Sequence, residues 1–408
     1  MKTSRLTALV TILIGLPVGC SGVTGRPADE AGLVARLPGP ITLITTSGAN
    51  SAVVSSGREI WWIGPEEKVV GVPLSSVFPR GGDPVVAPGP TLPKQVTLTE
   101  AGGILAVSGN LWTARLDEVR RYDSRRAVAD PGVAPMARIP LSPAAVSEHG
   151  NSTDIPMLAA FGSVWVLTLA NGGPGQEVVR IDSNKNEIVA RISVSGRRLE
   201  GNGGSLVANS RHLFVLSDGK IFKIDPGRNA VEGEFVANIP SLPGELPGRI
   251  NSVAALEDTL VAFGATYNSA LGSDRYSLTR IDPEKLYPVD QHGFDFEGAA
   301  MQVSEGIVIG DRAILAPASQ GIFRITIPAP GVTHVELKIQ PFLPPRSLPE
   351  YLCNSQTGIS YVSTSNGVVW AVDRNNGIWA LDPKQDRIPV SSHQEGSEDC
   401  PEEDPAGD

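Results

Sequence analysis

Apolar residues recur along this chain in short runs that open with a bulky side chain just after a tight turn. The third residue of each run is Trp, Phe, Val or Leu, and neighbouring runs lie 47 to 55 residues apart. A period near fifty residues, kept along most of a chain, is typical of a repeat architecture. The seven runs are 59–61, 110–112, 163–165, 212–214, 259–261, 313–315 and 368–370.

A second motif, which reads Arg-Ile-Asp or a variant of it, follows most of these runs. In the most regular copy, 161–196, a further alternating segment follows at 187–192, and a short apolar run such as 205–208 precedes the next unit. One unit is therefore predicted to contain four strands of about five or six residues, joined by turns rich in Gly, Asn, Asp, Pro and Ser. The motif occupies 121–123, 180–182, 223–225, 280–282, 324–326 and 380–382.

Four antiparallel strands per unit, repeated radially, predict an all-β chain that folds as a β-propeller of seven four-stranded blades over residues 46–392. Each small sheet has two apolar faces, and stacking the blades in a ring buries both. Residues 41–45 also read as a strand, either the innermost strand of the first blade or an added strand on the last. Residues 387–390 contain Pro389, which suits an outer edge strand.

The N-terminus predicts export. Lys2 and Arg5 precede an apolar stretch at 6–15, which has the length of the apolar core of a signal peptide. The stretch is too short to cross a bilayer of about 30 Å as a helix. We therefore expect a signal peptide over residues 1–19 and an extracytoplasmic protein.

Gly19 immediately before Cys20 resembles the lipobox of bacterial lipoproteins, although Pro17 stands where that pattern prefers Leu. The resemblance implies cleavage before Cys20 and acylation of its thiol and amine by fatty acids such as palmitate. Several acyl chains anchor a protein stably to a membrane surface. Release by an ordinary signal peptidase and a retained membrane anchor are the alternatives. Residues 20–45, rich in Gly, Pro and Ala up to about residue 40, would then act as a tether.

Two further cysteines, Cys353 and Cys400, are a plausible disulfide pair in an oxidising compartment. Such a bridge would hold the C-terminal tail, residues 393–408, against the last blade. The alternative is two unrelated thiols. The tail contains seven Asp or Glu and no Lys or Arg, which is typical of a solvated end; a cation-binding site there is the other interpretation.

The net charge of −10 argues against nucleic acid as a partner. The 44 glycines and 34 prolines supply the many turns that a β-propeller needs. No Ser/His/Asp arrangement, Gly-rich phosphate loop or Cys/His metal spacing is present in the sequence. The sequence therefore predicts no catalytic residue, no metal site and no cofactor.

The copy at 164–167, 179–182 and 189–196, with its echoes in the other units, resembles the repeat of YVTN-type β-propellers and their relatives, the streptogramin lyases. The resemblance covers most of residues 50–391 and is specific for the fold alone. The lyases of this group use a His and a metal-held carboxylate, and no residue of this chain matches those positions. The five His, at 149, 212, 292, 334 and 393, share no motif.

Two recurring residue types are candidate ligands but have simpler structural explanations. The Asp that ends each Arg-Ile-Asp motif offers a ring of carboxylates for a metal, yet its place at a strand end is better explained by an Asx turn. Trp112, Trp165 and Trp370 are candidates for a sugar-binding mouth. Because they lie within alternating strands, we expect them to pack between blades instead.

Irregular insertions are the better indication of function, because insertions in repeat proteins collect on one face, which often binds a partner. Ordinary variation in loop length is the alternative. Tyr267, Arg275 and Tyr276 are the contact residues that we expect, since Tyr and Arg are enriched at binding hot spots. The insertions cover 142–156, 238–251, 265–276 and 340–349.

The sequence thus favours a membrane-tethered propeller that binds a protein or cell-envelope partner. The alternatives are an enzyme, such as a lyase or hydrolase, with its site at the channel mouth, and a purely structural component of the envelope.

Overall fold

The structure is a computed structural model, and it describes the part of the chain that forms the predicted strands and many of their turns. The described residues are 41–44, 51–55, 58–64, 68–74, 96–130, 132–141, 155–170, 175–195, 204–236, 249–268, 273–294, 307–309, 312–318, 321–327, 338–343, 359–365, 368–373 and 377–381.

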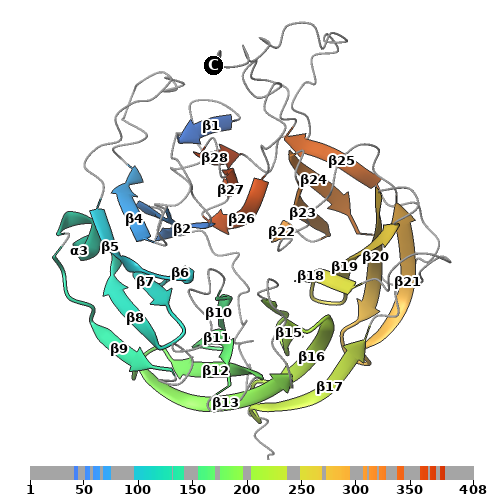
Figure 1. Cartoon of the computed structure of the whole chain (residues 1–408), viewed down its shortest axis with the longest axis horizontal. Helices are drawn as coiled ribbons and strands as arrows, with labels where there is room; N and C mark the ends of the chain where they lie inside the picture. Colours follow the sequence, from blue (N-terminus) through green and yellow to red (C-terminus); the bar gives the residue numbers. More distant parts are fainter. Residues whose placement is uncertain are drawn as a thin grey trace, which may run out of the picture.

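Seven four-stranded antiparallel sheets are formed by the described strands. They are arranged side by side around a central axis, with one edge strand of each sheet toward the axis (Figure 1). This arrangement confirms the predicted all-β class and the β-propeller fold. We call the sheets blades and number them from 1 to 7 in the order in which their innermost strands occur in the chain.

Blades 1 to 3 each consist of four consecutive strands. Blade 1 contains β2 (Ser51–Ser55), β3 (Glu59–Ile63), β4 (Lys68–Pro73) and β5 (Val96–Glu100). Blade 2 contains β6 (Gly103–Val107), β7 (Asn110–Ala114), β8 (Glu118–Asp123) and β9 (Ala137–Pro140), with helix α3 (Ser124–Ala129) between its last two strands. Blade 3 contains β10 (Met157–Ala160), β11 (Ser163–Leu169), β12 (Gln176–Asp182) and β13 (Glu187–Ser195).

Blades 4 to 6 follow the same plan. Blade 4 contains β14 (Ser205–Ala208), β15 (Leu213–Ser217), β16 (Lys220–Asp225) and β17 (Ala230–Val236). Blade 5 contains β18 (Arg249–Ala255), β19 (Leu260–Asn268), β20 (Ser273–Asp282) and β21 (Tyr287–Phe294). Blade 6 contains β22 (Ile307–Ile309), β23 (Ala313–Ala318), β24 (Gly321–Thr326) and β25 (Lys338–Leu343).

Blade 7 joins the two ends of the described chain. It contains β26 (Ile359–Ser365), β27 (Val368–Asp373), β28 (Gly377–Leu381) and, as its outermost strand, β1 (Ile41–Ile44). Strand β1 runs antiparallel to β28, with Ile41 opposite Leu381 and Ile44 opposite Ile378. Of the two positions considered for this strand, the added strand on the last blade is therefore correct.

The outer edge strand expected at 387–390 lies outside the described residues, and β1 holds the place beside β28 that it would have filled. The four residues of β1, Ile-Thr-Leu-Ile, are all β-branched or apolar and so favour a strand, whereas Pro389 lacks the N–H that a ladder needs.

The core lies in the seams between neighbouring blades, where the bulky residue of five of the seven repeated runs packs against the following blade. Trp112 clusters with Val164, Val166 and Ile181 of blade 3, and Trp165 clusters with residues of blade 4. Equivalent clusters contain Trp61 and blade 2, Phe214 and blade 5, and Trp370 and blade 1.

The solvent-exposed fraction is at most 1% for Trp112, Trp165 and Trp370. The expectation that these residues pack between blades is therefore confirmed, and they do not line a sugar-binding mouth. Truncating a core Trp of this kind to Ala typically costs about 3–5 kcal/mol.

A basic residue adds a directional contact to the seams after blades 2 and 3. The Arg180 guanidinium lies 5.0 Å from the ring centre of Trp165, the residue opposite it in the ladder. Its Nε donates to Ser163 Oγ at 2.9 Å, and its Nη1 donates to the Pro226 carbonyl and to Asn229 Oδ1, at 2.8 Å, in the outer turn of blade 4. We call this arrangement the blade clamp.

The same clamp closes the seam between blades 2 and 3. Arg121 lies 5.3 Å from the ring centre of Trp112 and donates to Asn110, to the Ser183 carbonyl and to Asn186 Oδ1 at 2.9 Å. Both acceptor asparagines have positive φ, 59° at Asn186 and 53° at Asn229, a conformation that Asn tolerates better than most residues.

In blades 4 and 1, residues other than arginine form the polar contact with the next blade. Lys223 reaches the Glu284 carbonyl of blade 5 at 2.7 Å. In blade 1 the ladder position opposite Trp61 is Gly71, where a Cβ atom would lie 2.2 Å from the Trp61 ring. Trp61 itself reaches the next blade, since its Nε1 donates to Ser124 Oγ at 2.7 Å.

We predict that Arg180 and Asn229 are energetically coupled. The free energy of unfolding is measured in urea for a double-mutant cycle of Arg180→Ala and Asn229→Gly. The coupling free energy should be about 1 kcal/mol, because either substitution alone already removes the hydrogen bond between the two side chains. Glycine keeps the positive φ at residue 229 without strain.

The matched control pairs Asn229→Gly with Arg125→Ala, an exposed arginine on α3, and should show additive effects. Additive effects for the Arg180 cycle as well would show that the clamp contributes nothing to the seam.

Candidate functional site

The strand order decides which connections share a face of the ring. In a blade whose four strands run up and down from the axis outward, the hairpin between the second and third strands lies at the same end as the connection to the next blade. Segments 142–156, 238–251 and 340–349 belong to connections between blades, and 265–276 contains the β19–β20 hairpin. The strands that flank all four predicted insertions therefore end on one face, which we call the connection face.

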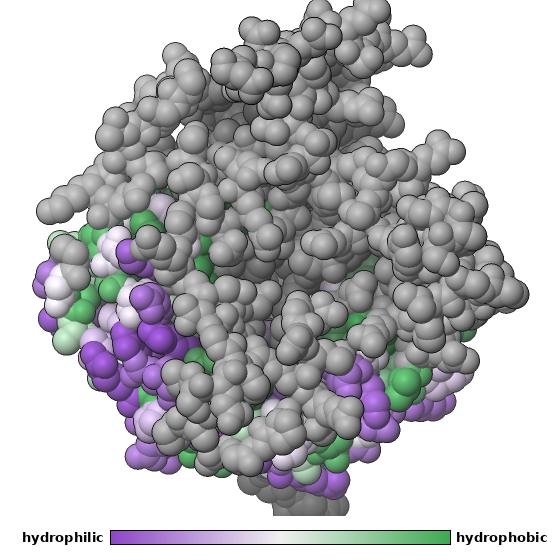
Figure 2. Space-filling model, in the orientation of Figure 1, coloured by the Kyte–Doolittle hydropathy of each residue, from purple (hydrophilic) through white to green (hydrophobic). Residues whose placement is uncertain are grey.

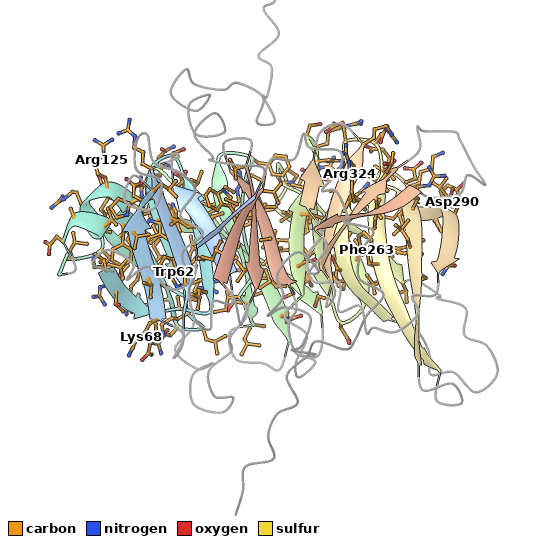
Figure 3. The ribbon with its side chains drawn as sticks, turned by 90° about the horizontal axis from the view of Figure 1, so that it is seen from above. Trp62, Lys68, Arg125, Phe263, Asp290 and Arg324 are labelled. Carbon is orange, nitrogen blue, oxygen red and sulfur yellow. The ribbon has the colours of Figure 1, made fainter. Side chains whose placement is uncertain are left out.

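The side view separates the two faces of the ring. Lys68, the first residue of the third strand of blade 1, lies on the same side as the tip of the long β19–β20 hairpin, whereas Arg125 of α3 lies on the opposite side (Figure 3). We call that opposite side the turn face, because the outer turns that accept hydrogen bonds from the blade clamps lie there.

The insertion of blade 5 is a ribbon of two strands and not the loop that we expected. Strands β19 and β20 have 9 and 10 residues and stay paired out to Asn268 and Ser273. Thr and Tyr, which are enriched in strands, occupy this stretch, so the ladder of the blade continues into it. Similarly, 249–251 belong to β18 and 340–343 to β25.

The tip of this ribbon extends past the neighbouring strands of its own sheet. The pairing of β18 with β19 ends at Ala265, and that of β21 with β20 ends at Tyr276. Three further pairs of β19 and β20 lie beyond these points. In Figure 3 the ribbon is the yellow hairpin that projects beyond the body of the ring.

The register brings together some of the predicted contact residues. Tyr267 is opposite Asp274, Tyr276 is opposite Ala265, and Arg275 is opposite Thr266. Because successive residues of a strand alternate between its two faces, the register positions of Tyr267 and Tyr276 share one face of the ribbon and that of Arg275 belongs to the other. The three residues thus belong to one element but not to one face, and their side chains lie outside the described residues.

The segment 142–156 has anchored ends. Leu141 donates its N–H to the Asp117 carbonyl at 2.7 Å, and its own carbonyl accepts from Arg191 of blade 3 at 2.5 Å. At the other end the Ile155 N–H donates to the Gly102 carbonyl at 3.0 Å. A Cβ atom at Gly103 would lie 2.1 Å from the Ile155 carbonyl oxygen, so the close approach depends on this glycine.

The seam between blades 3 and 4 ends near the connection face in polar contacts, in contrast to its apolar middle. Ser217 of blade 4 is hydrogen-bonded to Gln176 of blade 3, and Glu177 is paired with Arg191. The rim of blade 2 is likewise hydrophilic (Figure 2), with Arg138 61% exposed at its side chain. Ser217, Gln176 and Glu177 are themselves buried, so these polar contacts stabilise the ring, and Arg138 is the exposed charged group among the residues named.

The Asp of three of the motifs, at 182, 225 and 282, forms the Asx turn that we expected, while Asp123 is instead the N-cap of α3 and Asp382 lies outside the described residues. The Asp182 carboxylate accepts from the N–H groups of Lys185 and Asn184 at 3.0 and 2.9 Å, and these two bonds hold the pKa of Asp182 below its usual value. Asp225 and Asp282 make the same turn with the two N–H groups that follow. Among the described residues no group of three or more His, Cys, Asp or Glu is placed to hold a metal.

Several predicted site residues fall outside the described part of the chain. These are the lipidation residue Cys20, the proposed disulfide pair Cys353 and Cys400, and three of the five His. His212 has a described side chain, with Nε2 3.4 Å from a Glu232 oxygen and Nδ1 4.0 Å from a Glu284 oxygen. No described helix has the length and apolar character that crossing a bilayer requires.

The blade clamp is the feature that sequence reasoning missed. A basic residue stands directly before Ile-Asp at 180, 223 and 280, and the repeat of this residue type was the available signal. The long segment between β4 and β5, residues 74–95, was also not singled out; it begins on the turn face and, apart from Leu74, lies outside the described residues.

Comparison with known proteins supports the fold and goes no further. No protein-family model matches the sequence, and no curated protein matches it. The structure of U3-55K is similar to this chain with a TM-score of 0.51 and 10% identity, over 84% of this chain and 98% of that one. The WD40 β-propeller domain of Doa1 gives 0.50 and 9% over 85% and 95%, and hydrazine synthase of Kuenenia stuttgartiensis gives 0.52 and 13% over 82% and 96%.

Proposed function

We propose that this protein is a membrane-tethered, extracytoplasmic β-propeller that binds a protein or another component of the cell envelope through its connection face. The division of the ring into two faces carries this proposal. On the turn face, the outer turns of blades 3, 4 and 5 are each four residues long; the first two accept the blade clamps of Arg121 and Arg180, and the third accepts Lys223. These turns are committed to holding the ring together.

The predicted insertions, in contrast, lie in the chain at the opposite ends of the strands. The connections between blades 2 and 3, 4 and 5, and 6 and 7 run through the predicted insertions, and the β19–β20 ribbon stands above the same face. Segments that are longer than the fold requires and that differ from unit to unit are where repeat proteins carry their binding residues. The ribbon offers a rigid support for such residues, because its strands continue the ladder of blade 5.

The tether follows from the sequence of the N-terminus. Lipid on Cys20 would fix the chain at a membrane surface, and residues 20–40 would separate the anchor from β1, the outermost strand of blade 7. A disulfide between Cys353 and Cys400 would add a second restraint on the same blade, since Cys353 precedes β26 in the chain. The likeness of the blade copies to YVTN-type propellers, which include lipoproteins, agrees with this placement.

We predict that Ala at Tyr267, Arg275 or Tyr276 weakens capture of the partner by about 1–2 kcal/mol for each substitution. Large side chains on a projecting ribbon are well placed to fill pockets of a partner. The measurement is cross-linking and pull-down of the full chain from its native membranes, with quantification of the captured partner across a dilution series.

Arg125→Ala on the turn face is the control, and it should leave both capture and the thermal midpoint unchanged. Full capture by all three ribbon variants, or an equal loss in the Arg125 variant, would contradict the assignment of binding to the connection face.

We also predict that Cys20→Ala either releases the protein from the membrane or leaves an uncut precursor, because the Cys20 thiol is the acceptor of the first lipid. Fractionation with mass spectrometry of the mature N-terminus measures both outcomes. Cys353→Ala is the matched control and should keep the protein in the membrane fraction. Correctly processed Cys20→Ala protein that stays in the membrane would rule out lipidation as the anchor.

A further inference from the structure

The seam between blades 1 and 2 contains a buried carboxyl group that the proposed function does not use. Glu59 is the first residue of β3 and is 5% exposed, and Ser124 is the first residue of α3 and is fully buried. Ser124 Oγ accepts from Trp61 Nε1 at 2.7 Å and donates to Glu59 Oε2 at 3.3 Å. These three residues form a polar chain from the second strand of blade 1 to the helix of blade 2.

This seam differs from its neighbours because Gly71 stands where blades 2 and 3 have the clamp arginine. The Trp61 ring fills the space of the missing side chain, and α3 replaces the four-residue outer turn. The hydrogen bonds among Trp61, Ser124 and Glu59 therefore join blades 1 and 2. At the next two seams a permanently charged guanidinium group joins the blades. A carboxyl group, unlike a guanidinium, can gain and lose its charge within the range of pH that proteins meet.

The charged groups around Glu59 do not neutralise it. Arg58, the preceding residue, is exposed and favours the carboxylate, while Asp123, the N-cap of α3, disfavours it. The two arginines of α3, Arg125 and Arg126, are exposed. On β4 and β5 the charged residues Lys68 and Glu100 are opposite each other in the ladder, at the far end of the sheet from Glu59.

Burial raises the pKa of Glu59 above its usual value, and Asp123 adds to the rise, whereas the hydrogen bond from Ser124 and the charge of Arg58 act in the opposite direction. A carboxyl group whose pKa is raised by folding binds its proton more tightly in the folded state. It therefore favours folding while it is protonated, and this contribution is lost as the pH rises through the pKa of the folded state.

We propose that Glu59 is a proton-responsive joint between blade 1 and α3. The neutral carboxyl group accepts the hydrogen bond from Ser124 without placing a charge in the seam, and so holds α3 against the blade. The ionised group has to keep its charge in a buried seam and loosens the start of α3, because burying a charge without a full set of donors is costly. An extracytoplasmic ring would thus be held more tightly at this seam in acidic surroundings.

The test compares the thermal midpoints of the natural full-length protein and its Glu59→Gln variant as a function of pH. The Gln side chain has the shape of the neutral acid and carries no charge at any pH. The variant should melt a few degrees above the natural protein at about pH 8, and the difference should shrink toward zero as the pH falls to about 4. Glu187→Gln, at an exposed site on β13, is the matched control and should follow the natural protein throughout.

Hydrogen exchange of the peptide that contains α3, corrected for the intrinsic effect of pH, gives a second and local measurement. Its protection should increase on acidification in the natural protein and stay constant in Glu59→Gln. A difference in midpoint that does not depend on pH, a variant that is less stable than the natural protein at neutral pH, or a variant that fails to fold would each overturn the proposal.

Discussion

The contact between neighbouring blades is the interaction on which the whole structure depends. A four-stranded sheet with two apolar faces cannot be stable alone, and in five of the seven seams of this chain a bulky side chain of one blade packs against the next blade. Trp61, Trp112, Trp165 and Trp370 are at most 1% exposed in these seams. Because such burial has no preferred direction, the clamps of Arg121 and Arg180 matter: each binds defined acceptors in the next outer turn and so fixes how two blades meet.

Closure adds a second constraint, since a ring of blades needs a partner for its last edge. Strand β1 provides it by pairing with β28, about 340 residues later in the chain. The residues that hold the ring shut therefore follow directly after the proposed membrane tether. The packing in the blade seams and the closing ladder constrain the sequences of the strands and of the short outer turns. The sequences of the long connections are not constrained in this way.

The periodicity of the sequence predicted the class, the fold, the inward packing of the Trp residues and the Asx turns. These features depend on local pattern, which is visible within one repeat. The position of β1 was left between two possibilities, because strand pairing at closure depends on competition between distant segments. The blade clamp was not predicted for a related reason: Arg180 stands in one repeat and its acceptor Asn229 in the next, so no single copy contains the interaction.

The candidate site was predictable only as a location. The long insertions identified one face of the ring, and the strand order agrees with that grouping. The β19–β20 ribbon was taken for a loop because its composition mixes Ser, Asn and Gly with Tyr and Thr, and only the register shows that its ladder continues. The identity of a partner depends on side chains at the tip of this ribbon and in the connections, which the repeat pattern shared by all blades does not specify.

Hydrogen exchange of the full-length protein, with and without its captured partner, tests the central claim most directly. The claim is that one face of the ring holds the blades together while the other binds. Partner binding should slow exchange in peptides from the β19–β20 ribbon and the connections between blades, and leave the turns that contain Asn186 and Asn229 unchanged. Protection confined to those turns and to α3 would contradict the account.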